Sequence, residues 1–171
     1  GLAEDAKTNC PRCGRRKPED VVSELLRTTV EAVHRRKPGA PVMAWPYSAF
    51  IWSSDASQLE LAESRPEAVT WLNTIDKDQW ADKDGYKKHI WDYSIDYAGP
   101  ADNIVMQAEI VRRRGMKLAI KTETALGLEC IQYPYMPCLP RQAEKWRNVA
   151  ALQPDCVLQS WMFYGMWGSR S

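Results

Sequence analysis

Two carboxylates in this sequence stand just after runs that are typical of short strands. Asp76 follows the run 69–73, and Glu123 follows the run 117–122. Neighbouring strands lie ~4.8 Å apart, and glycoside hydrolysis needs two carboxyl groups about 5 to 10 Å apart. A carboxylate in such a place can equally cap the next helix or pair with a lysine. The catalytic interpretation of Asp76 and Glu123 therefore stands beside a purely structural one.

Aromatic residues gather near the same expected strand ends. The chain has eight Trp and seven Tyr but only two Phe, and Trp and Tyr combine an apolar ring with a polar tip. The C–H face of a sugar ring packs well on such a ring, although any single one could instead fill the core. Together they predict a sugar-binding wall formed by Trp45, Tyr47, Trp91 and Trp161, with Trp52 and Tyr93 as further candidates.

Cys10 and Cys13 form a Cys-x-x-Cys pair in the segment TNCPRCGRRK. Two thiolates at this spacing supply two corners of a tetrahedral zinc site, which needs two further ligands. Cys130 and Cys138 lie in one expected loop, so a structural zinc ion bound by all four would tie two loops together. The alternative is that segment 1–17 is a bare Cys-containing loop, and the chain requires no cofactor.

The balance of charges argues against two classes of partner. With 23 basic and 22 acidic residues the net charge is +1, so no overall field attracts the chain to nucleic acid or to anionic lipid. No apolar run reaches the about 18 residues of a membrane span, and we expect no signal peptide before Gly1. We therefore expect reduced cysteines and a cytoplasmic protein.

Of the two histidines, His34 is expected to be structural and His89 to be solvated in a charged loop.

Short apolar runs alternate along the chain with helical patterns, in which apolar residues recur at steps of three and four. We expect helices over residues 18–37, 58–63, 100–114 and 141–152. We expect strands over residues 42–45, 69–73, 90–94, 117–122 and 156–161, with a polar segment over 76–88. The apolar face of the first helix is expected at Val22, Leu25, Leu26, Thr29 and Val33. This alternation favours a parallel sheet covered by helices.

The fold class is therefore α/β, and both a doubly wound sheet and a (β/α)8 barrel fit it. No Gly-rich phosphate loop follows any expected strand, which argues against a dinucleotide-binding sheet. The strands are too few to close a barrel of eight. Taken as one domain, residues 1–171 are interpreted as about half of a (β/α)8 barrel, whose active site would lie at the carboxyl ends of the strands.

Four segments follow one another along most of the chain: CPRCGRRKPEDVVSELLRTTVEAVHRRKPGAPVMAW, WDYSIDYAGP, RRRGMKLAIKTET and CVLQSW. In order and character they resemble the C-terminal half of bacterial (β/α)8-barrel proteins related to family 20 glycoside hydrolases, which include β-N-acetylhexosaminidases. No single diagnostic motif carries the resemblance.

The resemblance implies a retaining mechanism, in which the acetamido group of the substrate attacks the anomeric carbon with help from an adjacent Asp-Glu pair at an earlier strand end. Glu19-Asp20 stands in the wrong order at a helix start, so the pair is expected upstream of Gly1 and the catalytic acid is unassigned. Trp45 and Trp161 then match tryptophans that wall the sugar subsite, and Glu123 would bond to sugar hydroxyls.

Three hypotheses follow. The first is a glycoside hydrolase-like barrel fragment that contributes aromatic and polar contacts to a carbohydrate. The second is a non-catalytic interaction module with a zinc-stapled Cys loop, and the third is a stand-alone enzyme that uses Asp76 and Glu123. A half barrel exposes sheet edges and an apolar inner face, so we expect it to pair with its missing N-terminal half or to form a homodimer.

Overall fold

The structure is a computed structural model of the chain. It describes residues 10–12, 14–47, 55–64, 66, 68–75, 79–90, 97–122 and 138–159. The chain divides into two compact units. The first unit comprises Gly1–Asn73 with Asp102–Ala119, and the second comprises Thr74–Ala101 with Ile120–Ser171.

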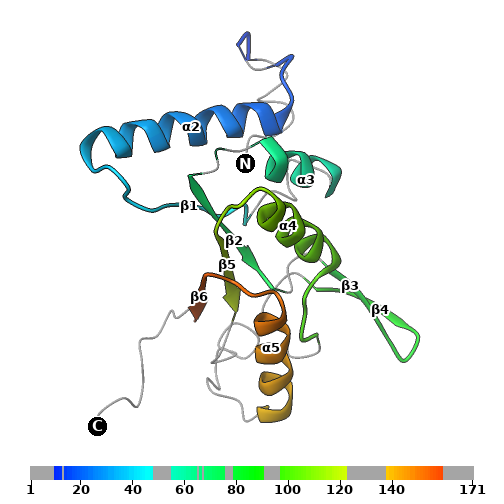
Figure 1. Ribbon diagram of the computed structural model, residues 1–171. Helices are drawn as coiled ribbons and strands as arrows, with labels where there is room; N and C mark the ends of the chain where they lie inside the picture. Colours follow the sequence, from blue (N-terminus) through cyan, green and yellow to red (C-terminus); the bar gives the residue numbers. More distant parts are fainter. Residues whose placement is uncertain are drawn as a thin grey trace, which may run out of the picture. The chain divides into compact units, whose positions relative to one another are not determined.

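Four parallel strands form the main sheet, in the spatial order β1-β2-β5-β6 (Figure 1). They are β1 (Val42–Ala44), β2 (Val69–Thr74), β5 (Leu118–Thr122) and β6 (Cys156–Gln159). Spatial order follows chain order, so each successive strand of this sheet is added on the same side as the one before. The predicted α/β class with parallel strands and intervening helices is confirmed, and over the described residues the sheet does not close into a barrel.

The helix α2 (Pro18–Arg36) precedes β1, and three helices lie between successive strands of this sheet in the described ranges: α3 (Asp55–Ser64), α4 (Asp102–Arg113) and α5 (Leu139–Ala151). The helix α2 begins with Pro18 and two acidic residues and ends with three basic ones, which suits both ends of the helix dipole. Near its end the His34 ring nitrogen Nε2 lies 2.9 Å from the carbonyl oxygen of Ala40. None of the helices in the described ranges has the length and apolar character of a membrane span.

In the first unit, α3 packs against both α2 and α4. The ammonium group of Lys17 lies 3.1 Å from the Glu60 carboxylate, and Arg113 pairs with Glu63. Arg114 also donates a 2.9 Å hydrogen bond to the carbonyl oxygen of Ala62, in the last turn of α3. Side chains from its neighbours thus satisfy charges and a terminal carbonyl of this short helix.

The predicted apolar face of α2 is wrong in part. Leu25 is 63% exposed, whereas Glu19, Ser23 and Val30 are buried. These three positions form a stripe at steps of four and seven, which is equally compatible with a helix. The apolar residues of α2 lie on two different stripes of the helix surface. The sequence pattern alone therefore did not determine which of these stripes faces the interior.

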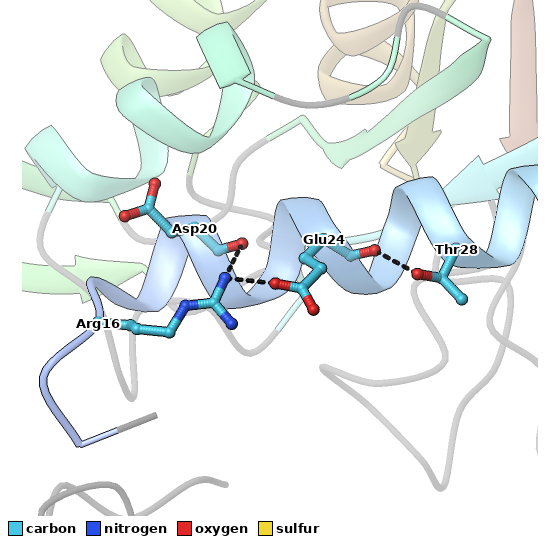
Figure 2. A network of polar contacts seen from close by, with 4 residues as sticks. All are labelled: Arg16, Asp20, Glu24 and Thr28. Atoms are coloured by element: carbon cyan, nitrogen blue, oxygen red, sulfur yellow. Dashed lines mark hydrogen bonds and ion pairs between the residues drawn. The ribbon is translucent and has the colours of Figure 1, made fainter. Parts of the chain in front are cut away.

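Polar contacts run along the exposed side of α2 from the Cys-containing loop (Figure 2). The guanidinium group of Arg16 lies 2.5 Å from the Glu24 carboxylate and 3.5 Å from the carbonyl oxygen of Asp20. The hydroxyl group of Thr28 donates a 3.0 Å hydrogen bond to the carbonyl oxygen of Glu24. Through Arg16, the residues that follow the Cys-x-x-Cys pair are fastened to the first turns of α2.

A hairpin in the second unit was not predicted. The strands β3 (Gln79–Lys83) and β4 (Tyr86–Ile90) pair antiparallel within the segment expected to be an irregular polar stretch (Figure 1). Asp84 and Gly85 join them with φ values of 55° and 82°, and an Asp-Gly pair is a favoured two-residue hairpin turn. Of the strand expected over residues 90–94, only Ile90 is among the described residues, where it ends β4. His89, expected in a loop, lies in β4.

Candidate functional site

Polar side chains occupy the carboxyl ends of β2 and β5, although every residue of both strands is buried. Thr74 ends β2, and Lys121 and Thr122 end β5 after three apolar residues. Lys121 is 0% exposed. In parallel α/β folds, this end of the sheet holds the active site. Lys121 was not among the predicted site residues, although a lysine that continues an apolar strand run is an unusual signal.

The hydrogen bonds between β2 and β5 place Thr74 beside Lys121. The amide of Ile75 donates a 3.0 Å hydrogen bond to the carbonyl oxygen of Lys121. In a parallel ladder, this bond sets Ile75 directly opposite Thr122, and therefore Thr74 opposite Lys121. Because side chains alternate between the two faces of a sheet, Thr74 and Lys121 share one face, and Ile75 and Thr122 share the other.

The chemistry of these groups is that of a polar binding site. An ammonium group is stable in a buried place only with negative charge or hydrogen-bond acceptors around it. Over the described residues, the buried hydroxyl groups of Thr74 and Thr122 have no hydrogen-bond partner. Such hydroxyls are exceptions in folded proteins, where nearly all buried polar groups are satisfied. On the face that carries Lys121, the hydroxyl group of Thr74 offers a donor and an acceptor to a ligand rich in oxygen atoms, whereas the hydroxyl group of Thr122 lies on the other face.

A loop in the second unit holds the end of β2 in place. The amide of Ala101 donates a 2.8 Å hydrogen bond to the carbonyl oxygen of Ile75. Gly99 has a φ of 72°, and a Cβ atom at this position would lie 2.9 Å from both Cγ1 and the carbonyl oxygen of Ile75. From α5, Asn148 donates a 2.6 Å hydrogen bond to the carbonyl oxygen of Gly99. The strand end that carries Thr74 is therefore braced by a loop and a helix, as a binding site requires.

In the first unit, a buried polar network joins β2 to α4. The indole nitrogen of Trp71 donates a 2.8 Å hydrogen bond to Oε1 of Gln107, and the amide nitrogen of Asn73 donates a 3.3 Å bond to the same atom. Trp71 is almost completely buried. This tryptophan fills the core and satisfies its polar tip there, so the abundance of Trp reflects packing in part.

Of the predicted aromatic wall, the structure brings together Trp45 and Tyr47, which follow β1. Their ring centroids lie 4.7 Å apart with an angle of 50° between the ring planes. Both side chains are half-buried, so the pair is held in place but still accessible. Four predicted members of the wall lie outside the described residues: Trp52, Trp91, Tyr93 and Trp161.

The two candidate catalytic carboxylates, Asp76 and Glu123, also lie outside the described residues. In the sequence, each directly follows a residue of the facing pair Ile75 and Thr122. Their predicted roles in catalysis or sugar binding therefore stay predictions.

The predicted zinc ligands are described only in part. Cys10 and Cys138 are half-buried, while Cys13 and Cys130 lie outside the described residues. The carbonyl oxygen of Cys10 accepts a 2.9 Å hydrogen bond from the amide of Gly14, so this segment forms a turn. Within the described ranges, no group of three or more His, Cys, Asp or Glu side chains is arranged to hold a metal ion.

No protein-family model, curated protein or solved structure matches the chain. The resemblance to family 20 glycoside hydrolases therefore stays a prediction.

Proposed function

We propose that this chain is a carbohydrate-binding part of a glycoside hydrolase-like (β/α)8 barrel, with its sugar contacts at the carboxyl ends of the parallel strands. The observation that carries the proposal is the tilted, half-buried pair of Trp45 and Tyr47 after β1. Sugar sites combine such ring faces with a few convergent polar groups. In the second unit, Thr74 and Lys121 place polar groups on one face at the carboxyl ends of β2 and β5, which is a separate candidate contact for a sugar.

The strand order supports the barrel over the doubly wound sheet. A doubly wound sheet reverses its order at a switch point, where its ligand binds. A barrel adds each strand on the same side as the last, because all its crossovers share one hand. The observed order β1-β2-β5-β6 contains no reversal. In this proposal the β3–β4 hairpin is an insertion between two βα units.

We propose that the groups of the active site are divided between this chain and a complementary segment. The Asp-Glu pair implied by the resemblance would come from the strands that complete the barrel, either in a further segment or in a second copy of the chain. Glu123 would bond to sugar hydroxyls, and no cofactor takes part. We propose that the assembled protein acts in the cytoplasm on oligosaccharides that contain N-acetylhexosamine.

The test is a direct binding measurement on the chain. Isothermal titration with N-acetylglucosamine, N-acetylgalactosamine and chitotetraose is expected to detect binding of at least one of them. Trp45→Ala and Tyr47→Ala are each expected to weaken it about tenfold or more, which corresponds to the loss of one good contact. The matched control is Tyr86→Ala, since Tyr86 is 81% exposed on the hairpin. Affinities unchanged by Trp45→Ala would rule out the aromatic pair as the sugar site.

A further inference from the structure

The β3–β4 hairpin carries a second pair of aromatic rings, at a position that the sequence analysis did not single out. Trp80 and His89 face each other across the two strands. Their ring centroids lie 4.8 Å apart, with an angle of 39° between the ring planes. Trp80 is nevertheless 64% exposed, so most of its surface is open to solvent while its position is fixed by the ring beside it.

Two charged side chains share the face of the hairpin that carries these rings. Asp82 faces Lys87 in the register, two residues further along each strand than Trp80 and His89. Since side chains alternate between the faces of a strand, these two pairs lie on the same face. A surface hollow of about 500 Å³ is lined by Trp80, Asp82, Lys87 and Ala81 among the described residues. The hollow therefore combines an indole ring with a carboxylate and an ammonium group.

The charges of this hollow indicate what kind of ligand it suits. Among its described lining residues, one carboxylate and one ammonium group balance each other, so these residues attract neither anions nor cations strongly. A carboxylate accepts hydrogen bonds and an ammonium group donates three, which suits a ligand with many hydroxyl groups. An indole ring offers a flat apolar surface. The ligand with this combination of a flat C–H face, hydroxyl groups and no net charge is a neutral pyranose.

We propose that this face of the β3–β4 hairpin is a second carbohydrate-binding subsite, in which a neutral pyranose ring stacks on Trp80 while Asp82 and Lys87 bond to its hydroxyl groups. The ligand class comes from the proposed function, but the residues are different from those at the strand ends. The subsite would hold one end of an oligosaccharide independently of the Trp45–Tyr47 pair. The competing explanation is that the two rings serve only to stabilise the hairpin, as cross-strand aromatic pairs do.

The test is titration of the full chain with cellotetraose and chitotetraose, followed by isothermal calorimetry and by saturation-transfer NMR of the sugar protons. Trp80→Ala is expected to weaken binding of at least one of them about tenfold, and Trp80→Phe is expected to retain most of it. Tyr86→Ala is the matched control, because Tyr86 faces Lys83 on the other side of the ribbon. It is expected to leave the affinity unchanged.

A second variant separates binding from hairpin stability. Asp82 accepts a 3.2 Å hydrogen bond from the Gly85 amide through Oδ1. Asp82→Asn retains an oxygen acceptor for this turn and leaves both rings in place. It is expected to weaken sugar binding severalfold without raising the exchange rates of the hairpin amides. If only the variants with faster-exchanging hairpin amides lose binding, the rings serve to stabilise the hairpin and the proposal is wrong.

The strand-end variants distinguish this subsite from the proposed function. If Trp45→Ala abolishes sugar binding while Trp80→Ala does not affect it, the subsite is wrong and the proposed function stands. If Trp80→Ala alone weakens binding, the subsite stands and the aromatic pair after β1 is not a sugar site. The subsite is wrong if the unmodified chain binds neither tetrasaccharide. It is also wrong if a single-stranded oligonucleotide, and not a tetrasaccharide, stacks on Trp80.

Discussion

The amide of Ile75 donates a 3.0 Å hydrogen bond to the carbonyl oxygen of Lys121. This bond sets the register of β2 and β5 and brings the buried hydroxyl of Thr74 opposite the buried amine of Lys121. Nothing in the packing of a parallel sheet requires a lysine here, because strands buried on both faces are usually apolar throughout. In the proposed function, this buried lysine at the carboxyl end of the strand contributes to sugar binding.

Replacing Lys121 with methionine tests that role. Met retains much of the length of the side chain without its amine, and removal of one member of a buried polar interaction is destabilising because the other member is left unsatisfied. We expect Lys121→Met to lower the thermal midpoint, and to weaken oligosaccharide binding about tenfold or more. Calorimetric titration and thermal unfolding of the same samples measure both quantities.

Lys145 provides the matched control for this substitution. It is also a buried lysine of the second unit, but it lies in α5 and not in a strand of the sheet. Lys145→Met is expected to leave sugar affinity unchanged. If both variants lose stability equally and bind sugar equally well, Lys121 has only a structural role.

Gly99 is predicted to tolerate no side chain. It has a φ of 72°, and a Cβ atom would lie 2.9 Å from the carbonyl oxygen of Ile75. Gly99→Ala therefore combines backbone strain with a steric clash against the end of β2, and we expect a loss of about 2 to 4 kcal/mol in the free energy of unfolding. Urea denaturation measures this loss.

Substitution of Gly39 separates the backbone strain from the steric clash. Its φ is 74°, but a Cβ atom there would meet nothing within 4 Å. Gly39→Ala should therefore show the backbone strain alone, about 1 to 2 kcal/mol. Equal losses in the two variants would mean that the loop moves away from Ile75 easily and does not brace the strand end.

Much of the fold was predictable because its signals are local. Proline and acidic residues at the start of α2, and basic residues at its end, indicate a helix without reference to the rest of the chain. The hairpin was missed because its strands are mostly exposed and lack an apolar alternation. Its local signal, Asp84-Gly85, stands inside a run of charged residues that resembles an irregular loop.

The candidate site was less predictable because it depends on tertiary structure. Lys121 was taken as part of a strand, but its burial depends on what covers both faces of that strand. Trp71 and Trp45 are both tryptophans in or next to a strand. Trp71 donates a hydrogen bond to Gln107 in the core, whereas the ring of Trp45 packs against Tyr47. Sequence patterns do not separate these two roles, since both require an aromatic ring beside a strand.

The ion pair of Lys17 and Glu60 predicts how acid affects the first unit. The hydrogen bond from Lys17 lowers the pKa of Glu60 below its ordinary value, and the hydrogen bond and charge of Glu60 raise the pKa of Lys17. Because the pKa of Glu60 is lower in the folded state, its contribution is present above the unfolded pKa of about 4.3 and is lost as the pH falls through the folded value.

Glu60→Gln measures this contribution. Both side chains are more than half exposed, at 66% for Lys17 and 53% for Glu60, so the effect is expected to be small and weakened by salt. We expect the variant to have a slightly lower thermal midpoint than the unmodified chain near neutral pH, and the difference to shrink as the pH falls below the unfolded pKa of about 4.3. A difference that grows on acidification would contradict the assigned pKa direction of Glu60.

Gln107 is predicted to be essential for packing α4 onto β2. Its Oε1 accepts hydrogen bonds from both Trp71 and Asn73. Gln107→Leu preserves most of the volume but leaves two buried donors without an acceptor, which should cost about 2 to 4 kcal/mol. Met106→Leu, at an exposed neighbouring position, is expected to change the free energy of unfolding by less than about 0.5 kcal/mol. Urea denaturation distinguishes the two, and similar losses would contradict the network.

The zinc site predicted from Cys10, Cys13, Cys130 and Cys138 is testable by metal analysis. Tetrahedral ligation by four thiolates predicts one zinc ion per chain, and removal of one ligand should release it. Cys10→Ser is therefore expected to lose the metal and to lower the thermal midpoint. Cys156→Ser changes an exposed cysteine outside the set and is expected to retain both. Chain purified without chelator that carries no zinc would exclude the four-cysteine site and leave a bare loop anchored to α2 through Arg16 and Glu24.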